Sequence, residues 1–361
     1  MNKNSSIYIA GHTGLVGSAL LRRLDADGYS NLIVRNRSDL DLTHQSDVDA
    51  FFQSEKPEYV FLAAAKVGGI MANYTYPAEF IHTNLAIQHN VIHAAWKAGA
   101  IRLLFLGSSC IYPKECPQPM KEEHLLTGPL EPTNESYAVA KIAGIKMCQA
   151  YNRQYGTKYL CVMPTNLYGP NDNFDLETSH VLPALIRNFH LAKLANQGDW
   201  EAIKKDEKKY GIIPEDIKQR IGYKTFRSTV LSESSGFKPS VLLWGSGKPR
   251  REMLHVDDLA DACVFLSKLD ENIYRRFFNP SRTPLINIGC GKDQTIKEVA
   301  KIIAEIVGYT GRVKWDKDKP DGTPQKLLDI SQIIRLGWKP NITLKDGIDR
   351  VYRWYLKGMT G

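Results

Sequence analysis

Ile7-Tyr8-Ile9-Ala10-Gly11-His12-Thr13-Gly14-Leu15-Val16-Gly17 is the stretch of sequence that decides the fold. Its first four residues are apolar and predict a short buried strand, and the residues after its last glycine predict an amphipathic helix. Glycines between a strand and a helix let the backbone turn tightly and approach a pyrophosphate, which the helix N-terminus attracts. The spacing is GxxGxxG rather than GxGxxG. In this context of strand, turn and helix, we interpret it as a dinucleotide-binding turn.

The remainder of the chain repeats this alternation of strand and helix. Further buried strands are predicted at 32–34, 59–62, 103–106 and 160–163, with helical segments between them. The alternation predicts an α/β fold, a doubly wound parallel sheet (Rossmann) with a smaller α/β C-terminal substrate domain. We place the cofactor domain at 1–170 plus roughly 252–292, and the substrate domain at 171–251 and 293–361. An insertion at about 192–240 is expected to hold helices and a mobile loop near 232–236.

Composition excludes several classes of function. The 361 residues are 43% hydrophobic and 24% charged, and no apolar run is long enough to cross a bilayer. The six cysteines lack CxxC spacing, so we expect a reduced, cytoplasmic protein without a metal site. The net charge is +8, but basic and acidic residues are interleaved, which argues against nucleic acid as a partner. A small substrate that carries phosphate groups explains the surplus of positive charge better than nucleic acid does.

The second predicted strand ends in Arg35-Asn36-Arg37, and this strand end bears on the identity of the cofactor. A site selective for NAD usually has an acidic residue there, which binds the ribose hydroxyls. This chain has Arg37 instead, and a guanidinium suits the 2′-phosphate of NADP. The sequence therefore favours NADP over NAD.

A second decisive stretch is Ser136-Tyr137-Ala138-Val139-Ala140-Lys141. Tyr137 and Lys141 are four residues apart, so on a helix they share one face. A nearby ammonium favours the phenolate, so we expect Lys141 to lower the pKa of Tyr137. Reduction of a ketone needs an acid of this kind to protonate the carbonyl oxygen. By itself, a tyrosine and a lysine at this spacing are more often part of an ordinary helical surface.

Longer motifs indicate a family. In chain order they are AGHTGLVGSA, AAAKVGGI, FLGSSCIYP, EPTNESYAVAKIAGIK, MPTNLYGPNDNF, REMLHVDDLA and KPDGTPQKLLD. Through them the sequence resembles the extended short-chain dehydrogenase/reductase superfamily and, within it, the GDP-L-fucose synthases. This resemblance implies the conversion of a GDP-4-keto-6-deoxy-D-mannose to GDP-L-fucose, by epimerisation of two carbons and reduction of the ketone with NADPH. It also implies a homodimer in which helices around Ile87 and Tyr137 form a bundle.

The same resemblance assigns the reacting groups. Ser108, Tyr137 and Lys141 would form the catalytic triad of the reductase, and Cys110 and His180 would exchange protons in the epimerisations. A thiol and an imidazole can both exchange protons near neutral pH. Judged alone, Cys110 could be a small buried hydrophobe, and His180 could be a helix-capping residue.

Binding residues also follow from the resemblance. The cofactor would lie against the glycine turn, the ends of two strands and parts of the catalytic helix: Gly11, His12, Thr13, Gly14, Leu15, Val16, Gly17, Arg37, Leu106, Gly107, Ser108, Ser109, Lys141, Pro164, Thr165, Asn166, Leu167 and His180. The nucleotide sugar would contact Asn188, Trp244, Arg251, Asp321 and Lys326. An aromatic ring suits guanine and basic groups suit a diphosphate, although Trp244 could instead be a core residue.

Three departures from the family pattern keep alternatives open. Thr13 stands where the family often has arginine, and Asn188 stands where a basic residue is expected. The insertion resembles that of related enzymes that reduce GDP-linked keto-heptoses. A GDP-6-deoxy-4-keto-heptose reductase, or an epimerase/reductase for the same sugar, is therefore the first alternative. A non-catalytic NADP(H)-binding regulator on the same fold is the second.

Overall fold

The computed structural model describes residues 1–223, 237–279, 282–319 and 321–359. The chain forms two compact units. Unit 1 comprises Met1–Asn171, Glu252–Lys292 and Lys326–Ile342, and unit 2 comprises Asp172–Arg251, Asp293–Gln325 and Thr343–Gly361. The chain passes between the units five times, and two of these crossings lie within strands, β8 (Arg250–His255) and β12 (Gln325–Lys326).

A six-stranded parallel sheet forms the centre of unit 1, with the order β2-β1-β3-β4-β5-β9. Its strands are β1 (Ile7–Ala10), β2 (Leu32–Ile33), β3 (Tyr59–Leu62), β4 (Arg102–Leu106), β5 (Tyr159–Pro164) and β9 (Leu285–Ile288). They are apolar and almost entirely buried, as parallel strands covered on both faces are. The strand order reverses between β1 and β3, and ligands of such sheets bind at that point, beyond the carboxyl ends of the strands.

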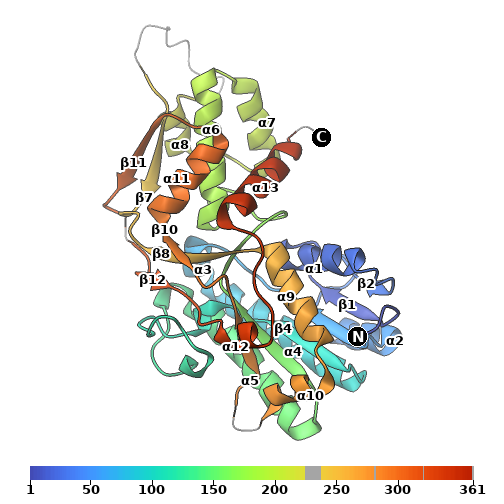
Figure 1. Cartoon of the computed structure of the whole chain (residues 1–361). Coiled ribbons are helices and arrows are strands. Elements are labelled where there is room, and N and C mark those ends of the chain that lie inside the picture. The colour runs from blue at the N-terminus through green and yellow to red at the C-terminus, as the bar shows by residue number, and fades with distance from the viewer. Residues whose placement is uncertain (224–236, 280–281, 320, 360–361) are drawn as a thin grey trace. The chain divides into compact units, whose positions relative to one another are not determined.

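Helices cover both faces of this sheet, so the prediction of a doubly wound parallel sheet is confirmed (Figure 1). One face packs against α1 (Leu15–Ala26) and α9 (Val256–Lys268), and the other against α2 (Gln45–Glu55), α4 (Pro77–Lys97) and α5 (Glu135–Tyr155). Helices α4 and α5 lie side by side. The shorter elements of unit 1 are α3 (Ile70–Thr75), α10 (Glu271–Tyr274), α12 (Ser331–Arg335), β6 (Asn166–Tyr168) and the 3-10 turns η1 (Ser109–Ile111), η2 (Glu122–His124), η3 (Pro132–Asn134) and η4 (Arg275–Phe278).

Unit 2 is a smaller α/β assembly. Its strands β7 (Ser240–Trp244) and β11 (Arg312–Asp316) pair in parallel, and α6 and α8 pack near β7. The other elements are α6 (Val181–Gln197), α7 (Trp200–Tyr210), α8 (Glu215–Ile221), β10 (Asp293–Thr295), α11 (Ile296–Val307) and α13 (Leu344–Lys357). Helices α7 and α8 lie in the predicted insertion, as expected. The loop predicted near 232–236 lies outside the described residues.

One predicted boundary is wrong. The sequence predicts the segment 326–342 in the second domain, but this segment packs in unit 1. The cause is the buried carboxylate of Glu252, which accepts hydrogen bonds from the backbone N–H groups of Leu328 (3.0 Å) and Gly291 (2.6 Å). These bonds hold the returning chain at Leu328, and the loop at Gly291, against Glu252 of β8. A buried carboxylate requires such donors, because burial without them is costly.

No helix within the described ranges combines the length and the apolar character that a membrane span needs. Within the same ranges, no group of three or more His, Cys, Asp and Glu residues could hold a metal ion.

Candidate active site

Helix α5 carries Tyr137 and Lys141 on one face, as their spacing predicted. The Nζ atom of Lys141 lies over the Tyr137 ring, 5.7 Å from its centroid. Lys141 is only 3% exposed and donates a hydrogen bond of 2.7 Å to the carbonyl oxygen of Leu106. That carbonyl belongs to the last residue of β4. The phenol and the ammonium therefore lie at the carboxyl end of a central strand, where parallel sheets bind their ligands.

Two further predicted groups follow the same strand. Ser108 precedes the short turn η1, and its Oγ accepts a hydrogen bond of 3.4 Å from the backbone N–H of Cys110. Cys110 is buried. Unit 1 thus brings Ser108 and Cys110 to the strand end that Lys141 contacts.

The pKa of Lys141 falls from its ordinary value of 10.5 to about 8, because burial disfavours the charged ammonium. Burial also raises the pKa of Tyr137, and the nearby Cys110 raises it further. The expectation that Lys141 lowers the pKa of Tyr137 is therefore wrong for this arrangement, since desolvation of the phenolate outweighs the attraction of the ammonium. Tyr137 is therefore a neutral phenol at physiological pH.

Burial is also the main influence on the pKa of the Cys110 thiol. It raises the pKa of Cys110, while a hydrogen bond with Ser108 and the positive charges of Lys326 and Lys141 act in the opposite direction. The net result is a protonated thiol whose pKa is sensitive to two lysines. Lys326, predicted to bind substrate, thus acts on the pKa of a predicted catalytic residue of unit 1.

The glycine turn after β1 has the features that a dinucleotide requires. Gly11 has a φ of 83°, and a Cβ on Gly17 would lie 2.0 Å from the Gly11 carbonyl oxygen. The turn therefore packs directly on the start of α1. A Cβ on Gly14 would meet only that same carbonyl oxygen, at 3.5 Å, so the chain leaves space beside this exposed residue.

The start of α1 is also suited to an anion. No side chain caps the helix at Gly14, and its first turn holds no acidic residue. The first N–H groups of a helix lack intrahelical partners, and they attract phosphate. The buried Nδ1 atom of His12 has no hydrogen-bond partner within the described part of the chain. These features fit a dinucleotide pyrophosphate at the Gly11–Gly17 turn.

Other predicted cofactor residues lie at the same edge of the sheet. Gly107 and Ser109 follow β4, and Pro164 ends β5. Thr165 and Asn166 both donate side-chain hydrogen bonds to the carbonyl oxygen of Glu252, at 3.2 and 2.9 Å. Leu15 and Val16 open α1, and Leu167 lies in β6.

Arg37 and Thr13 are the two residues that bear on NADP. The Arg37 side chain is 82% exposed, and Asp41 is its ion-pair partner at 3.4 Å. A long exposed pair of this kind is weak, so the guanidinium can turn to a phosphate. Thr13 is also exposed.

The remaining predicted site residues lie in unit 2. His180 is exposed and immediately precedes α6, and Asn188 lies half-buried within that helix. Trp244, at the end of β7, is 59% exposed, which excludes the alternative that it packs in the core. The ammonium of Lys319 lies 5.3 Å from the Trp244 ring centroid.

Arg251 and Asp321 are both engaged within unit 2. Nη1 of Arg251 donates to the carbonyl oxygens of Thr323 (2.6 Å) and Arg250 (2.8 Å). The Asp321 carboxylate accepts hydrogen bonds from the backbone N–H and the hydroxyl of Ser246, at 2.8 and 2.6 Å. These bonds lower the pKa of Asp321. Asp321 therefore holds the turn that follows Trp244.

The structure divides the predicted site into two sets. Ser108, Cys110, Tyr137, Lys141 and Lys326 lie in unit 1 with the glycine turn, and the other predicted substrate residues lie in unit 2 with His180. The pairing of Cys110 with His180 stays a prediction. Sequence reasoning missed Glu252, although an acidic residue inside the run REMLHV of a buried strand is an available signal.

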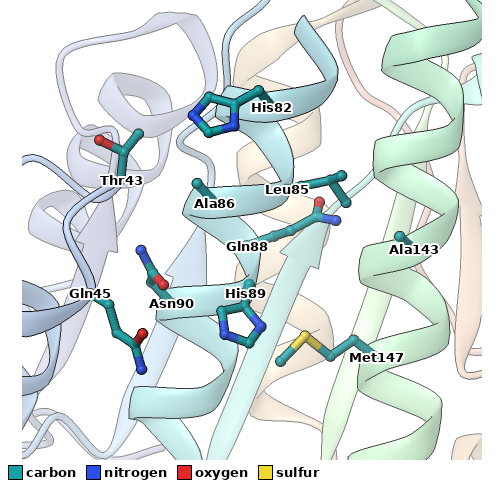
Figure 2. Close-up of a pocket in the computed structure, with 10 residues that line it drawn as sticks. All are labelled: Thr43, Gln45, His82, Leu85, Ala86, Gln88, His89, Asn90, Ala143 and Met147. Atoms are coloured by element: carbon teal, nitrogen blue, oxygen red, sulfur yellow. The ribbon is translucent and has the colours of Figure 1, made fainter. Parts of the chain in front are cut away.

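A separate cavity lies on the face that α4 and α5 share. It has a volume of about 600 Å³ and contains none of the predicted site residues. Figure 2 shows its lining residues, which come from the loop before α2, the first residue of α2 and the two long helices: Thr43, Gln45, His82, Leu85, Ala86, Gln88, His89, Asn90, Ala143 and Met147.

Comparisons with known proteins agree with this architecture. The NAD dependent epimerase/dehydratase family matches residues 7–205 and 222–279. A putative GDP-L-fucose synthase 2 of Arabidopsis thaliana is 53% identical over 99% of this chain and 94% of its own length. The GDP-L-fucose synthase of Escherichia coli is 48% identical over 97% of this chain and 96% of its own length.

Among solved structures, a GDP-D-glycero-L-gluco-heptose synthase from Campylobacter jejuni, crystallised in the presence of NADPH, is 42% identical. It covers 99% of both chains with a TM-score of 0.86. The resemblance seen in the sequence motifs is thereby confirmed. The chain belongs to the NAD dependent epimerase/dehydratase family and, within it, to the group of the GDP-L-fucose synthases.

Proposed function

We propose that this chain is an NADPH-dependent epimerase and reductase that converts GDP-4-keto-6-deoxy-D-mannose to GDP-L-fucose. The observation that carries the proposal is the Tyr137–Lys141 pair at the end of β4, beside Ser108 and Cys110. An acid, a cation, a hydroxyl and a thiol at one strand end are the groups that this reaction needs. Their roles below are proposals.

In the reduction, the neutral phenol of Tyr137 gives its proton to the C4 oxygen of the sugar. The Lys141 ammonium stabilises the negative charge that develops on that oxygen, and the Ser108 hydroxyl donates a second hydrogen bond to it. NADPH, when bound, supplies the hydride. The Gly11–Gly17 turn would hold its pyrophosphate, and Arg37 its 2′-phosphate.

In the epimerisations, Cys110 and His180 exchange protons with C3 and C5. These carbons flank a ketone, so loss of a proton places the negative charge on the C4 oxygen as an enolate. Tyr137 and Lys141 stabilise that charge, and a proton returned to the opposite face of the carbon inverts it. The protonated thiol of Cys110 suits the acid in this exchange, and a neutral imidazole suits the base.

Unit 2 would bind the nucleotide. The exposed ring of Trp244 offers a face for guanine, and its turn is held by Asp321. Arg251 and Lys326 would bind the diphosphate, with Asn188 as a polar contact. A fit of this kind would select a GDP-sugar over a free sugar.

A GDP-6-deoxy-4-keto-heptose reductase, or an epimerase/reductase of that sugar, is the second candidate. The heptose synthase from Campylobacter jejuni favours it, since that structure matches nearly the whole chain at 42% identity. The presence of both Cys110 and His180 favours the epimerase over a plain reductase. The candidates differ in the sugar and share the reducing groups.

We also propose a cytoplasmic homodimer. The face of α4 and α5 with its cavity of about 600 Å³ would pack against a second copy, and apolar side chains such as Leu85 and Met147 support this (Figure 2). None of the six cysteines, all of which lie in the described ranges, forms a disulfide. Sedimentation of the purified chain as a monomer would contradict the dimer.

The test of the proposed function is product analysis. The purified protein is incubated with NADPH and GDP-4-keto-6-deoxy-D-mannose, and in parallel with a GDP-4-keto-heptose. We expect NADPH absorbance to fall with the hexose and GDP-L-fucose to form. Oxidation with the heptose alone would favour the second candidate, and no oxidation with either sugar would contradict both.

A further inference from the structure

Phe80 is an aromatic residue outside the predicted site that contacts the ring of Tyr137. Phe80 lies in the first turn of α4 and is 2% exposed. Its ring centroid is 6.3 Å from that of Tyr137, with the planes at 86°. This edge-to-face geometry is a favoured arrangement of two aromatic rings.

Because the Lys141 ammonium lies over the face of the Tyr137 ring, the phenol has two neighbours that restrict its rotation. The hydroxyl of Tyr137 itself makes no hydrogen bond within the described ranges. Ring contacts therefore replace hydrogen bonds as the means by which this part of the chain orients the phenol.

The position of Phe80 is itself fixed by the loop after β3. A Cβ on Gly68 would lie 3.2 Å from Cζ of Phe80 and 3.0 Å from Cβ of Ala72. These distances are shorter than ordinary van der Waals contact. A methyl group at position 68 would therefore displace the Phe80 ring or Ala72 by a few tenths of an ångström.

Asn84, one turn further along α4, ties the same loop to the helix. Its Oδ1 accepts a hydrogen bond of 3.0 Å from the Lys66 N–H, and its Nδ2 donates to the carbonyl oxygens of Lys66 (3.0 Å) and Phe80 (2.8 Å). Asn84 is 2% exposed, so these bonds are shielded from water. Loop, helix and ring thus form one rigid support.

We infer that Phe80, supported by Gly68 and Asn84, is a positioning residue that fixes the orientation of the Tyr137 phenol toward the reacting oxygen. The inference rests on the proposed role of Tyr137 as the proton donor. Phe80 acts through Tyr137 and takes no part in the chemistry. Its removal should therefore slow the reaction without weakening the binding of NADPH.

The first test replaces Phe80 by leucine, which keeps an apolar side chain and removes the ring. We expect kcat of Phe80→Leu to fall about 10- to 100-fold, the cost of a small misplacement of a reacting group, with KM for NADPH within about twofold. The matched control is Phe52→Leu. Phe52 is 1% exposed and packs edge-to-face on Tyr8 (5.6 Å, 89°), so it loses the same kind of contact far from the reacting groups.

The second test displaces Phe80 without changing it. Gly68→Ala puts a methyl group against the Phe80 ring, and we expect a fall of about tenfold in kcat. In the double variant the leucine leaves room for that methyl group, so the two losses should not multiply. Such coupling is expected for residues in contact and absent for independent sites.

Three outcomes decide the inference. The inference is supported if the wild type is active, both single variants have a lower kcat, and these losses in kcat do not multiply in the double variant. If the wild type is active but kcat of Phe80→Leu is unchanged, the positioning role is overturned and the proposed function still holds. The same conclusion follows if the losses in kcat multiply in the double variant. A wild-type protein that oxidises no NADPH overturns both. If Phe80→Leu does not fold, Gly68→Ala with intact NADPH binding decides alone.

Discussion

Two clusters, one in each unit, contain a tyrosine and a buried cation, and they differ in how many of their polar groups form hydrogen bonds within the described chain. In unit 2, Arg187 is completely buried; its Nε donates to Asp206 Oδ1 (2.8 Å), and its other nitrogens donate to backbone carbonyls of Phe174, Tyr210 and Gly211. The Tyr355 hydroxyl donates to the second carboxylate oxygen of Asp206.

In unit 1, by contrast, Lys141 has one hydrogen bond, to Leu106, and Tyr137 has none within the described ranges. Buried polar groups are nearly always hydrogen-bonded, so a cluster with every group bonded is a structural element. The Lys141 ammonium has three N–H donors and uses one of them on the described chain, so it and the Tyr137 hydroxyl keep capacity for a ligand. This difference supports the proposed roles, with Tyr355 as part of the fold and Tyr137 as part of the reaction.

Exchange of the two tyrosines for phenylalanine gives the largest expected contrast. Tyr137→Phe removes the proton donor, and we expect NADPH oxidation with GDP-4-keto-6-deoxy-D-mannose to fall by about 10²- to 10⁴-fold. The fold should be unaffected, because this hydroxyl makes no hydrogen bond to the described chain. The measurement is the initial rate of NADPH absorbance loss.

The matched control is Tyr355→Phe. It deletes the hydroxyl bonded to Asp206, which should cost about 1–3 kcal/mol of stability while turnover stays within a few-fold of wild type. A Tyr137→Phe protein with wild-type turnover would end the assignment of Tyr137.

The second prediction concerns the ion pair in unit 2. Asp206→Asn leaves the Arg187 guanidinium buried without its counter-charge, which we expect to destabilise the protein by about 3–5 kcal/mol. Urea denaturation measures the change. The control is Glu201→Gln, which breaks an exposed pair with Lys204 and should cost less than about 1 kcal/mol. Equal losses would show that the buried cluster is not a structural element.

A third prediction tests Cys110 by isotope exchange. In deuterated water and with the reduction slowed by omission of NADPH, Cys110→Ser should slow deuterium uptake at C3 and C5 by about 10²-fold, since a hydroxyl is a weaker acid–base group. Mass spectrometry of the recovered sugar measures the uptake. Cys290→Ser, a partly exposed cysteine of the same unit, is the control and should exchange at the wild-type rate. Wild-type uptake in Cys110→Ser would remove its assigned role.

The pH dependence should distinguish Lys141 from a surface lysine. Its pKa is about 8 in the folded protein and 10.5 when unperturbed. The ammonium is present below pH 8 and lost above it, so we expect turnover to fall by about tenfold per pH unit beyond this point. The rate profile from pH 6 to 10 measures this.

Stability should respond with the opposite sign. Between about pH 8 and 10.5 the unfolded chain binds more protons at Lys141 than the folded chain, so the contribution of this residue to stability rises with pH. As the pH rises from about 8 to 10.5, the free energy of unfolding of the wild type should therefore increase relative to that of Lys141→Met. A turnover that stays constant up to pH 10 would contradict the buried ammonium.

Local patterns were sufficient to predict much of unit 1. The strand, glycine turn and helix at 7–26 and the helical spacing of Tyr137 and Lys141 are properties of contiguous sequence, and the structure has both. The direction of the Tyr137 pKa shift was not predictable, because it depends on burial by distant segments. The same limit explains segment 326–342, whose anchor on Glu252 joins residues 76 positions apart. Phe80 was missed for this reason too, since its contact with Tyr137 connects two helices.

The smallest expected effect concerns Trp244. It tests whether unit 2 also has a side chain that is available to bind a ligand. Its ring is 59% exposed, and a stacked guanine would gain about 0.5–1.5 kcal/mol from it. Trp244→Ala should therefore raise KM for the GDP-sugar by a few-fold and leave kcat nearly unchanged, because the ring contributes to binding in the ground state and the transition state alike. The control is Trp200→Ala, a tryptophan of unit 2 that is 39% exposed and already stacks on Tyr223 at 6.3 Å. If both variants raise KM equally, Trp244 has no special contact with the nucleotide, and the contrast between used and unused groups would hold only for unit 1.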